Sequence, residues 1–171
     1  MVACFIGHRT ITVTNELCER IRTTVLDLID NQGADTFLFG SRSQFDELCL
    51  KIVTEIKEIR PHIRRIYVRA EYPYISADYE KYLLTFYDET YMPESIIHAG
   101  KAIYIERNRH MIDSSDICLM YFDNKYSLNQ NHNSGTKDIH KYAVSKKKLI
   151  INFNTLLNEN SRLNLSGFYN I

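Results

Sequence analysis

The chain has 171 residues and no net formal charge at pH 7. This length suits one domain with a full hydrophobic core, and a neutral charge balance does not favour nucleic acid or an acidic membrane as a partner. Twelve Tyr and eight Phe, without Trp, add many amphipathic rings. Such rings favour an adhesive surface, and we therefore expect a homo-oligomer.

The cysteines are four, widely spaced and without a C-x-x-C pair; they are Cys4, Cys18, Cys49 and Cys118. Each falls in an apolar strand-like run or on a helix, which is typical of small buried side chains in a reducing compartment. Met1 leads straight into a strand-like run, and no apolar segment reaches the roughly 20 residues that cross a bilayer. We expect a cytoplasmic protein without membrane association.

Short apolar runs bounded by turn residues predict the strands. They fall at 2–6, 36–39, 64–69, 117–122 and 148–152, with a further short strand at 89–92. Apolar residues at helical spacing predict the helices. The first follows a cap at Thr14 or Asn15 and ends near Gly33, and the second begins at Ser43 and ends before Pro61. Later helices are expected at 77–87, around Arg107, and at 135–145.

Strands and helices therefore alternate along the chain. This order predicts an α/β fold with a doubly wound, mostly parallel sheet and helices on both faces. One domain is expected over 1–153, with a polar C-terminal tail over 154–171. The polar, Asn-rich stretch from 123 to 133 is typical of a mobile loop that can close over a ligand.

Ligands of such folds bind in the crevice at the carboxyl ends of the strands. The segments expected there are Gly7-His8-Arg9, Gly40-Ser41, Arg69-Ala70-Glu71 and Ser134-Gly135-Thr136. The last of these resembles a helix start with exposed backbone N–H groups. Together with the Arg107 guanidinium, it would suit a phosphate.

The polar residues near this crevice each have a structural alternative. Arg107 could pair with Glu106 or Asp113 instead of binding a ligand, and Asn108 could tie loop backbone. Asp46 could be a first-turn carboxylate of its helix, or it could bind a ribose hydroxyl or a base.

The roles of His8 and Arg9 remain open, and the other histidines are not expected to bind a metal. His8 and Arg9 could cap a turn rather than contact phosphate. The histidines at 98, 110, 132 and 140 have no ligand spacing with cysteines or carboxylates, so we expect no metal.

Four motifs recur in the order seen in a known family. They are Gly7-His8-Arg9; Phe39-Gly40-Ser41 with Phe45-Asp46; Arg107-Asn108 with Met111-Ile112-Asp113 and Ser115-Asp116; and Ser134-Gly135-Thr136 with Tyr142-Ala143. From Val2 to about Asn152 the chain resembles the SLOG superfamily, the Rossmann-like group of the YpsA-like, DprA and LOG proteins, and most of all its bacterial YpsA-like branch.

The resemblance implies a nucleotide or nucleotide-derived ligand, such as an ADP-ribose-like molecule, with no further cofactor. LOG-like members cleave an N-glycosidic bond with a glutamate that follows a Gly-Thr motif. Gly135-Thr136 match that motif and Arg107 matches the family arginine, but Ile139 occupies the glutamate position. Asp138 lies one residue early, about 100° around the helix. Asp138 and Glu106 are the remaining catalytic candidates.

Three functions follow as hypotheses. The first is a binding module that senses a nucleotide signal in stress regulation or immunity, and the missing glutamate favours it. The second is a nucleotide N-glycosidase or phosphoribohydrolase, in which Glu71, Glu106 or Asp46 supplies the carboxylate. The third is a homo-oligomeric scaffold with a tyrosine-rich surface.

Overall fold

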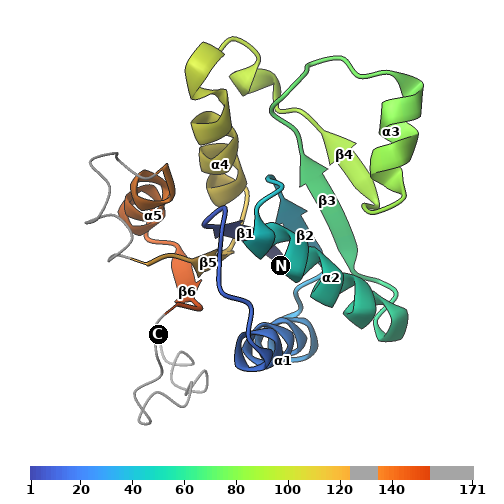
Figure 1. The fold of residues 1–171 in the computed structure, drawn as a ribbon, viewed down its shortest axis with the longest axis vertical. Helices are drawn as coiled ribbons and strands as arrows, with labels where there is room; N and C mark the ends of the chain where they lie inside the picture. The colour runs from blue at the N-terminus through green and yellow to red at the C-terminus, as the bar shows by residue number, and fades with distance from the viewer. Residues whose placement is uncertain (124–134, 155–171) are drawn as a thin grey trace.

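The computed structural model describes residues 1–123 and 135–154, and it contains a six-stranded sheet in which every pair of neighbours is parallel (Figure 1). The strands are β1 (Val2–Gly7), β2 (Thr36–Phe39), β3 (Arg64–Val68), β4 (Glu89–Tyr91), β5 (Ile117–Tyr121) and β6 (Leu149–Asn152). Their order is β4-β3-β2-β1-β5-β6. The chain therefore adds strands outward on one side of β1 and then changes direction between β1 and β5.

Helices cover both faces of this sheet. They are α1 (Asn15–Gln32), α2 (Gln44–Ile59), α3 (Ala77–Leu84), α4 (Ile103–Asp113) and α5 (Gly135–Ser145), with short 3₁₀ turns at Glu94–Ile96 and Gly100–Ala102. Helices α1 and α2 and Leu83 of α3 share one core with the sheet, whereas α4 and α5 share a second core on the opposite face. The predicted doubly wound α/β fold is thus confirmed, with all strands parallel.

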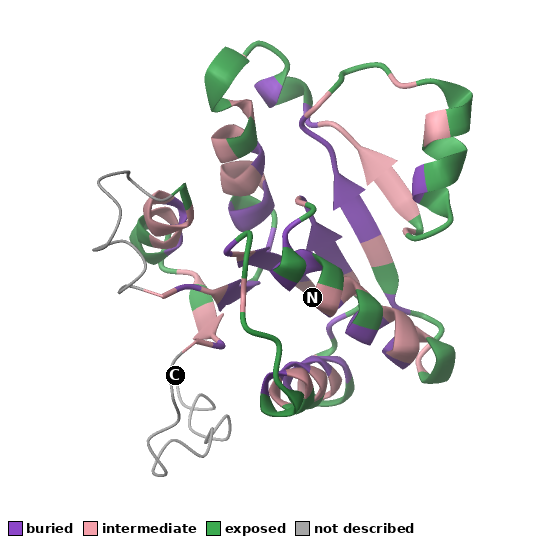
Figure 2. Ribbon diagram, in the orientation of Figure 1, coloured by how far each residue is buried: buried purple, intermediate pink, exposed green. Residues whose placement is uncertain are grey.

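Alternate residues of each strand build the two cores. On the α1–α2 face, the Phe5 ring stacks on Phe39 with centroids 5.0 Å apart. On the α4–α5 face, Met111 and Ile112 are fully buried beside the even-numbered residues of β1 and β5. Figure 2 shows the central strands buried and the exposed residues on the outer sides of the helices. Burial on both faces explains why the strands have continuous apolar sequences.

Hydroxyl side chains start three of the helices. Thr14, Ser43 and Ser76 are the N-caps of α1, α2 and α3, and each side chain accepts a hydrogen bond from the backbone N–H three residues later. Such caps satisfy amide groups that have no partner within the helix. The caps predicted at residues 14 and 43 are confirmed.

Several strands and helices are shorter than the sequence predicted. The strands β3 and β5 end at Val68 and Tyr121, and α3 ends at Leu84 rather than at Tyr87. The amides of Phe86 and Tyr87 both bond to the Leu83 carbonyl, which ends the regular helix. This turn carries the Tyr87 ring onto Tyr67, where the two rings stack at 5.0 Å. Tertiary packing therefore overrides the helical pattern there.

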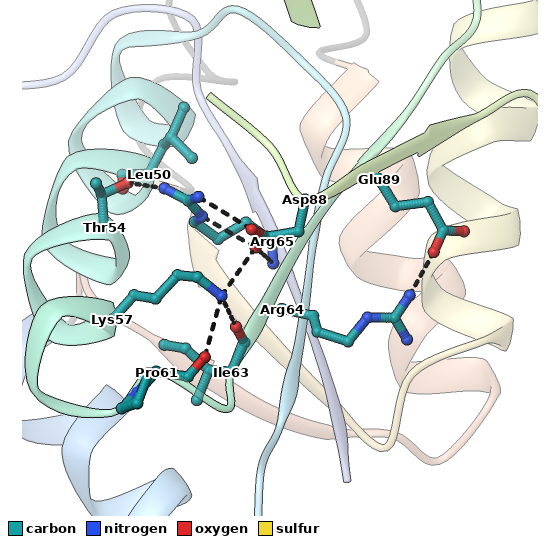
Figure 3. A network of polar contacts seen from close by, with 9 residues as sticks. All are labelled: Leu50, Thr54, Lys57, Pro61, Ile63, Arg64, Arg65, Asp88 and Glu89. Atoms are coloured by element: carbon teal, nitrogen blue, oxygen red, sulfur yellow. Dashed lines mark hydrogen bonds and ion pairs between the residues drawn. The ribbon is translucent and has the colours of Figure 1, made fainter. Parts of the chain in front are cut away.

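A cluster of charged side chains joins α2 to β3 and to the start of β4 (Figure 3). The Arg65 guanidinium donates to both carboxylate oxygens of Asp88 and also to the Thr54 hydroxyl. Lys57 Nζ lies 3.3 Å from Asp88 Oδ2 and donates to the carbonyls of Pro61 and Ile63. The edge strand β4 is thereby fastened to the sheet by side chains as well as by its backbone.

Three of the four cysteines are buried and Cys18 is half-buried, and all four are free thiols. The expected loop at 123–133 and the tail at 154–171 lie outside the described residues, apart from Asp123 and Asn154. No helix in the described ranges is long and apolar enough to cross a membrane.

Candidate functional site

A cavity of about 770 Å³ opens at the carboxyl ends of β1 and β2, next to the point where the strand order changes direction between β1 and β5. Its lining residues come from the segment after β1, the loop between β2 and α2, the helix α4 and the first residues of α5. Doubly wound folds bind ligands at this position.

Most of the predicted ligand-binding residues come together here. Those that line the cavity are Gly7, His8, Arg9, Gly40, Ser41, Asp46, Arg107, Asn108, Gly135 and Thr136. Ser134 lies outside the described residues. Arg69 does not line the cavity: its side chain is buried and donates to the Tyr72 carbonyl at 2.8 Å, which holds the loop after β3.

Arg107 is the buried cation of the cavity. Only 2% of this residue is exposed, because it comes from the sheet-facing side of α4, one turn before Met111. Its Nε donates to Asn108 Oδ1 at 2.8 Å, and its Nη1 donates to the Val68 carbonyl at 3.3 Å. Among the described residues, none accepts a hydrogen bond from Nη2 and no carboxylate forms an ion pair with Arg107.

Arg107 therefore does not form the ion pair with Glu106 or Asp113 that was its structural alternative. Glu106 pairs with Arg109 instead, at 2.8 Å, and Asp113 accepts a hydrogen bond from the Tyr142 hydroxyl. The Asn108 side chain contacts the Arg107 side chain, and no hydrogen bond from it to loop backbone occurs among the described residues. Asn108 lines the cavity and also fixes the orientation of the Arg107 side chain.

Gly40 makes room for this arginine. A Cβ atom at residue 40 would lie 2.5 Å from Met111 Sδ and 2.8 Å from Arg107 Nε. Both distances are shorter than a van der Waals contact, so any side chain would displace the guanidinium. The glycine that follows β2 is thus needed for the packing of Arg107 over the sheet.

Asp46 is the buried carboxylate of the cavity. Its Oδ2 accepts hydrogen bonds from the Ser41 backbone N–H at 2.8 Å and from the Ser41 hydroxyl. Its Oδ1 is buried without a hydrogen-bond partner among the described residues. Burial is the main cause that raises the pKa of Asp46 to about 6, while the Ser41 hydrogen bonds and attraction to Arg107 act to lower it.

These two buried groups differ from an ordinary ion pair. Burial lowers the pKa of the Arg107 guanidinium, and attraction to Asp46 opposes this effect. An arginine remains charged even so. The cavity therefore contains a cation with a free donor and a carboxyl with a free oxygen, and a ligand that accepts from one and donates to the other would fit both.

His8 has a structural role in addition to lining the cavity. Its Nε2 accepts a hydrogen bond from the Asp123 backbone N–H at 2.9 Å, which connects the end of β1 to the end of β5. Burial lowers the pKa of His8, and an accepting Nε2 requires that this nitrogen carry no proton. Gly7 permits the close approach of the Phe45 ring, which would lie 2.4 Å from a Cβ atom there.

Neither catalytic candidate lines the cavity. Glu106 does not line it and pairs with Arg109, and Asp138 also does not line it. Ile139, at the position of the family's glutamate, is 1% exposed and belongs to the core under α5. The carboxyl groups that do line the cavity are those of Asp46 and Glu71.

Sequence reasoning missed Tyr104, Ile105, Thr10 and Arg42 as residues of this site, and all four line the cavity. Tyr104 lies three residues before Arg107 and so on the same side of α4, a spacing that could have revealed it. Arg42 donates to the Tyr79 hydroxyl at 2.9 Å, a contact with α3 that no local pattern indicates.

The described residues contain no group of three or more His, Cys, Asp or Glu side chains that could hold a metal ion. The cavity instead has the donors that suit an organic anion: three arginines and the start of α5. In comparisons with known proteins, no protein-family model and no curated sequence matches this chain.

Proposed function

We propose that the cavity binds a nucleotide or a nucleotide-derived molecule, such as one that contains ADP-ribose, as the sequence resemblance to the YpsA-like branch of the SLOG superfamily implies. The observation that carries this proposal is the buried guanidinium of Arg107, which lines the cavity and keeps Nη2 without a partner among the described residues. A phosphate in the cavity would accept a charge-assisted hydrogen bond from this nitrogen.

The surroundings of Arg107 support a phosphate. Gly135 and Thr136, the first residues of α5, face the same cavity, and a helix N-terminus attracts anions through its free N–H groups. Arg9 and Arg42 add positive charge at the lining. The free oxygen of Asp46 would then accept a hydrogen bond from a ligand hydroxyl, such as one of a ribose.

Calorimetric titration with AMP, ADP-ribose and NAD tests the proposal. At least one should bind, and Arg107→Ala should weaken it by about 2 kcal/mol, or about 30-fold, since charge-assisted hydrogen bonds contribute roughly 1.5–3 kcal/mol. Arg109→Ala is the matched control, because Arg109 lies on the same helix, pairs with Glu106 and does not line the cavity. Equal affinity in the Arg107 variant would contradict the proposal.

A second function, hydrolysis of an N-glycosidic bond, is favoured by one observation. Asp46 offers a buried carboxyl with a free oxygen and a pKa raised to about 6 by burial. Such a group could take a proton from water as the water oxygen attacks the anomeric carbon and the base departs. Incubation with AMP or NAD should then release free base or nicotinamide, and Asp46→Asn should abolish the release.

Self-association is a separate proposal, based on exposed aromatic side chains around α3. Tyr74 is 91% exposed and Tyr72 64% exposed. Light scattering behind a sizing column should show more than one copy per particle. Conversion of both residues to Ser should reduce the mass of the particle if they form the contact.

A further inference from the structure

The proposed nucleotide site contains one partly exposed aromatic ring, and the Arg107 guanidinium lies over the face of this ring. Tyr104 lines the cavity, yet 53% of it is exposed. Among the described residues, none accepts a hydrogen bond from its hydroxyl and no second ring packs on it. Other tyrosines do have partners: Tyr79, for example, binds Arg42, and Tyr91 contacts His110.

The position of this ring is tied to that of the proposed phosphate ligand. Tyr104 and Arg107 are three residues apart on α4, and the guanidinium carbon lies 5.9 Å from the ring centroid. A group bound to Arg107 would therefore lie close to this aromatic ring. The neighbouring Ile105 adds apolar lining on the same stretch of helix.

We infer that Tyr104 is the platform on which the base of the bound nucleotide stacks, and that the site therefore selects nucleotides over sugar phosphates without a base. This inference rests on the proposed nucleotide-binding function. Each base has a flat π surface, and stacking on an aromatic side chain is tolerant of base identity. The cavity would then recognise two parts of the ligand: Arg107 would bind the phosphate and Tyr104 would bind the base.

The test compares two ligands that differ only by the base, AMP and ribose 5-phosphate, by calorimetric titration. The wild-type protein should bind AMP more tightly. Tyr104→Leu should lose about fivefold or more in AMP affinity, since base stacking contributes roughly 1–3 kcal/mol. It should leave the affinity for ribose 5-phosphate unchanged, and Tyr104→Phe should keep the wild-type preference, because the ring rather than the hydroxyl stacks.

Tyr82→Leu is the matched control. Tyr82 is also 53% exposed, but it lies on α3 and does not line the cavity. Its replacement should change neither affinity. Circular dichroism melting of all variants would show that each is folded.

The outcomes separate this inference from the proposed function. If Tyr104→Leu weakens AMP and ribose 5-phosphate equally, Tyr104 supports the site without stacking, and the inference falls while the proposed function stands. The same follows if wild type binds both ligands equally well. If wild type binds neither ligand, nor ADP-ribose or NAD, both the inference and the proposed function are overturned.

Discussion

Two clusters of charged side chains lie at opposite ends of the sheet, and they differ in how completely they are paired. At the amino-terminal ends of β3 and β4, Arg65 and Lys57 both contact Asp88, and the guanidinium binds both carboxylate oxygens (Figure 3). At the carboxyl ends of β1 and β2, Asp46 and Arg107 are more deeply buried, yet Asp46 Oδ1 has no hydrogen-bond partner among the described residues.

The difference indicates what each cluster does. Charges that are paired and hydrogen-bonded offset much of the cost of leaving water, whereas a buried charge with a free atom does not. The Asp88 cluster therefore stabilises the fold. The Asp46–Arg107 cluster costs stability in the free protein, and under the proposed function its unused atoms would bind a ligand. Changes in the first should alter stability alone, and changes in the second should alter both stability and ligand affinity.

The largest expected effect is the pH dependence that Asp46 imposes on stability. Burial raises the pKa of Asp46 to about 6 in the folded protein, so the folded state binds this proton more tightly than the unfolded state does. The contribution of Asp46 is therefore most favourable below pH 4 and declines as the pH rises through 6. At about 1.4 kcal/mol for each pKa unit, the decline is on the order of 3 kcal/mol.

Urea unfolding of wild type and Asp46→Asn between pH 4 and pH 7.5 would measure this effect. The difference in unfolding free energy between the two proteins should shift in favour of the Asn variant as the pH rises, because Asn does not ionise. A difference that stays constant across this range would show that burial does not raise the pKa of Asp46.

The second effect concerns the paired cluster. Asp88→Ala removes the partner of Arg65 and Lys57, and it should lower the free energy of unfolding by about 2 kcal/mol, less than for a fully buried pair because a quarter of the Asp88 side chain is exposed. Ligand affinity should not change. Denaturant unfolding and calorimetry on the same samples test the two halves of this statement.

The control for Asp88→Ala is the pH dependence of its difference from wild type in unfolding free energy. Although burial acts to raise the pKa of Asp88, hydrogen bonds from Arg65 and attraction to Lys57 lower it. The stabilisation is then fully present above the ordinary range for Asp and is lost as the pH falls below about 4. A stability difference that persists unchanged at pH 3 would mean that packing, rather than charge, is lost in Asp88→Ala.

The strands and the strand-end loops could be predicted from the sequence because their signals are local. The run from Val2 to Ile6 ends in glycine, and Ser43 stands three residues before Asp46, so both elements are fixed by their own residues. The end of α3 could not be predicted in this way. The sequence remains helical in pattern up to Tyr87. In the structure the helix ends earlier, and the Tyr87 ring stacks on Tyr67 of β3.

The sequence predicted site residues both in the strand-end loops and on α4, where Arg107 and Asn108 were found but Tyr104 was missed. Gly40 and Asp46 were found because they sit in the loop after β2 and in the first turn of α2. Arg69 follows a strand too, but its side chain is used to hold the loop at Tyr72. Sequence position gives the strand end but not the direction of the side chain.

Gly40→Ala should have a smaller effect on stability and should move Arg107. The added methyl group would meet Met111 and Arg107 at distances under 3 Å, and an overpacked site of this kind costs about 1–3 kcal/mol. We expect a loss near the lower end, about 1 kcal/mol, because the guanidinium can shift toward the cavity. Affinity for AMP should fall with it, and calorimetry should detect this.

Gly33→Ala is a comparison for that variant, since residue 33 has open space around it but a φ of 69°. Its cost would come from backbone strain at the end of α1, far from the cavity, so its affinity should equal that of wild type. If Gly40→Ala also kept full affinity, the orientation of Arg107 would not matter for binding.

The smallest effect is expected at the outer edge of the paired cluster, where Arg64 donates to Glu89 (Figure 3). These side chains are 53% and 46% exposed. Water and salt screen such a pair, so Glu89→Gln should change the free energy of unfolding by less than about 0.5 kcal/mol. Asp88 precedes Glu89 directly, so neighbouring carboxylates contacted by neighbouring arginines would then differ several-fold in their contribution. Denaturant unfolding in low and high salt would measure it. A loss in Glu89→Gln as large as that in Asp88→Ala would show that the edge strand β4, rather than burial of the charges, sets the stability of this end of the sheet.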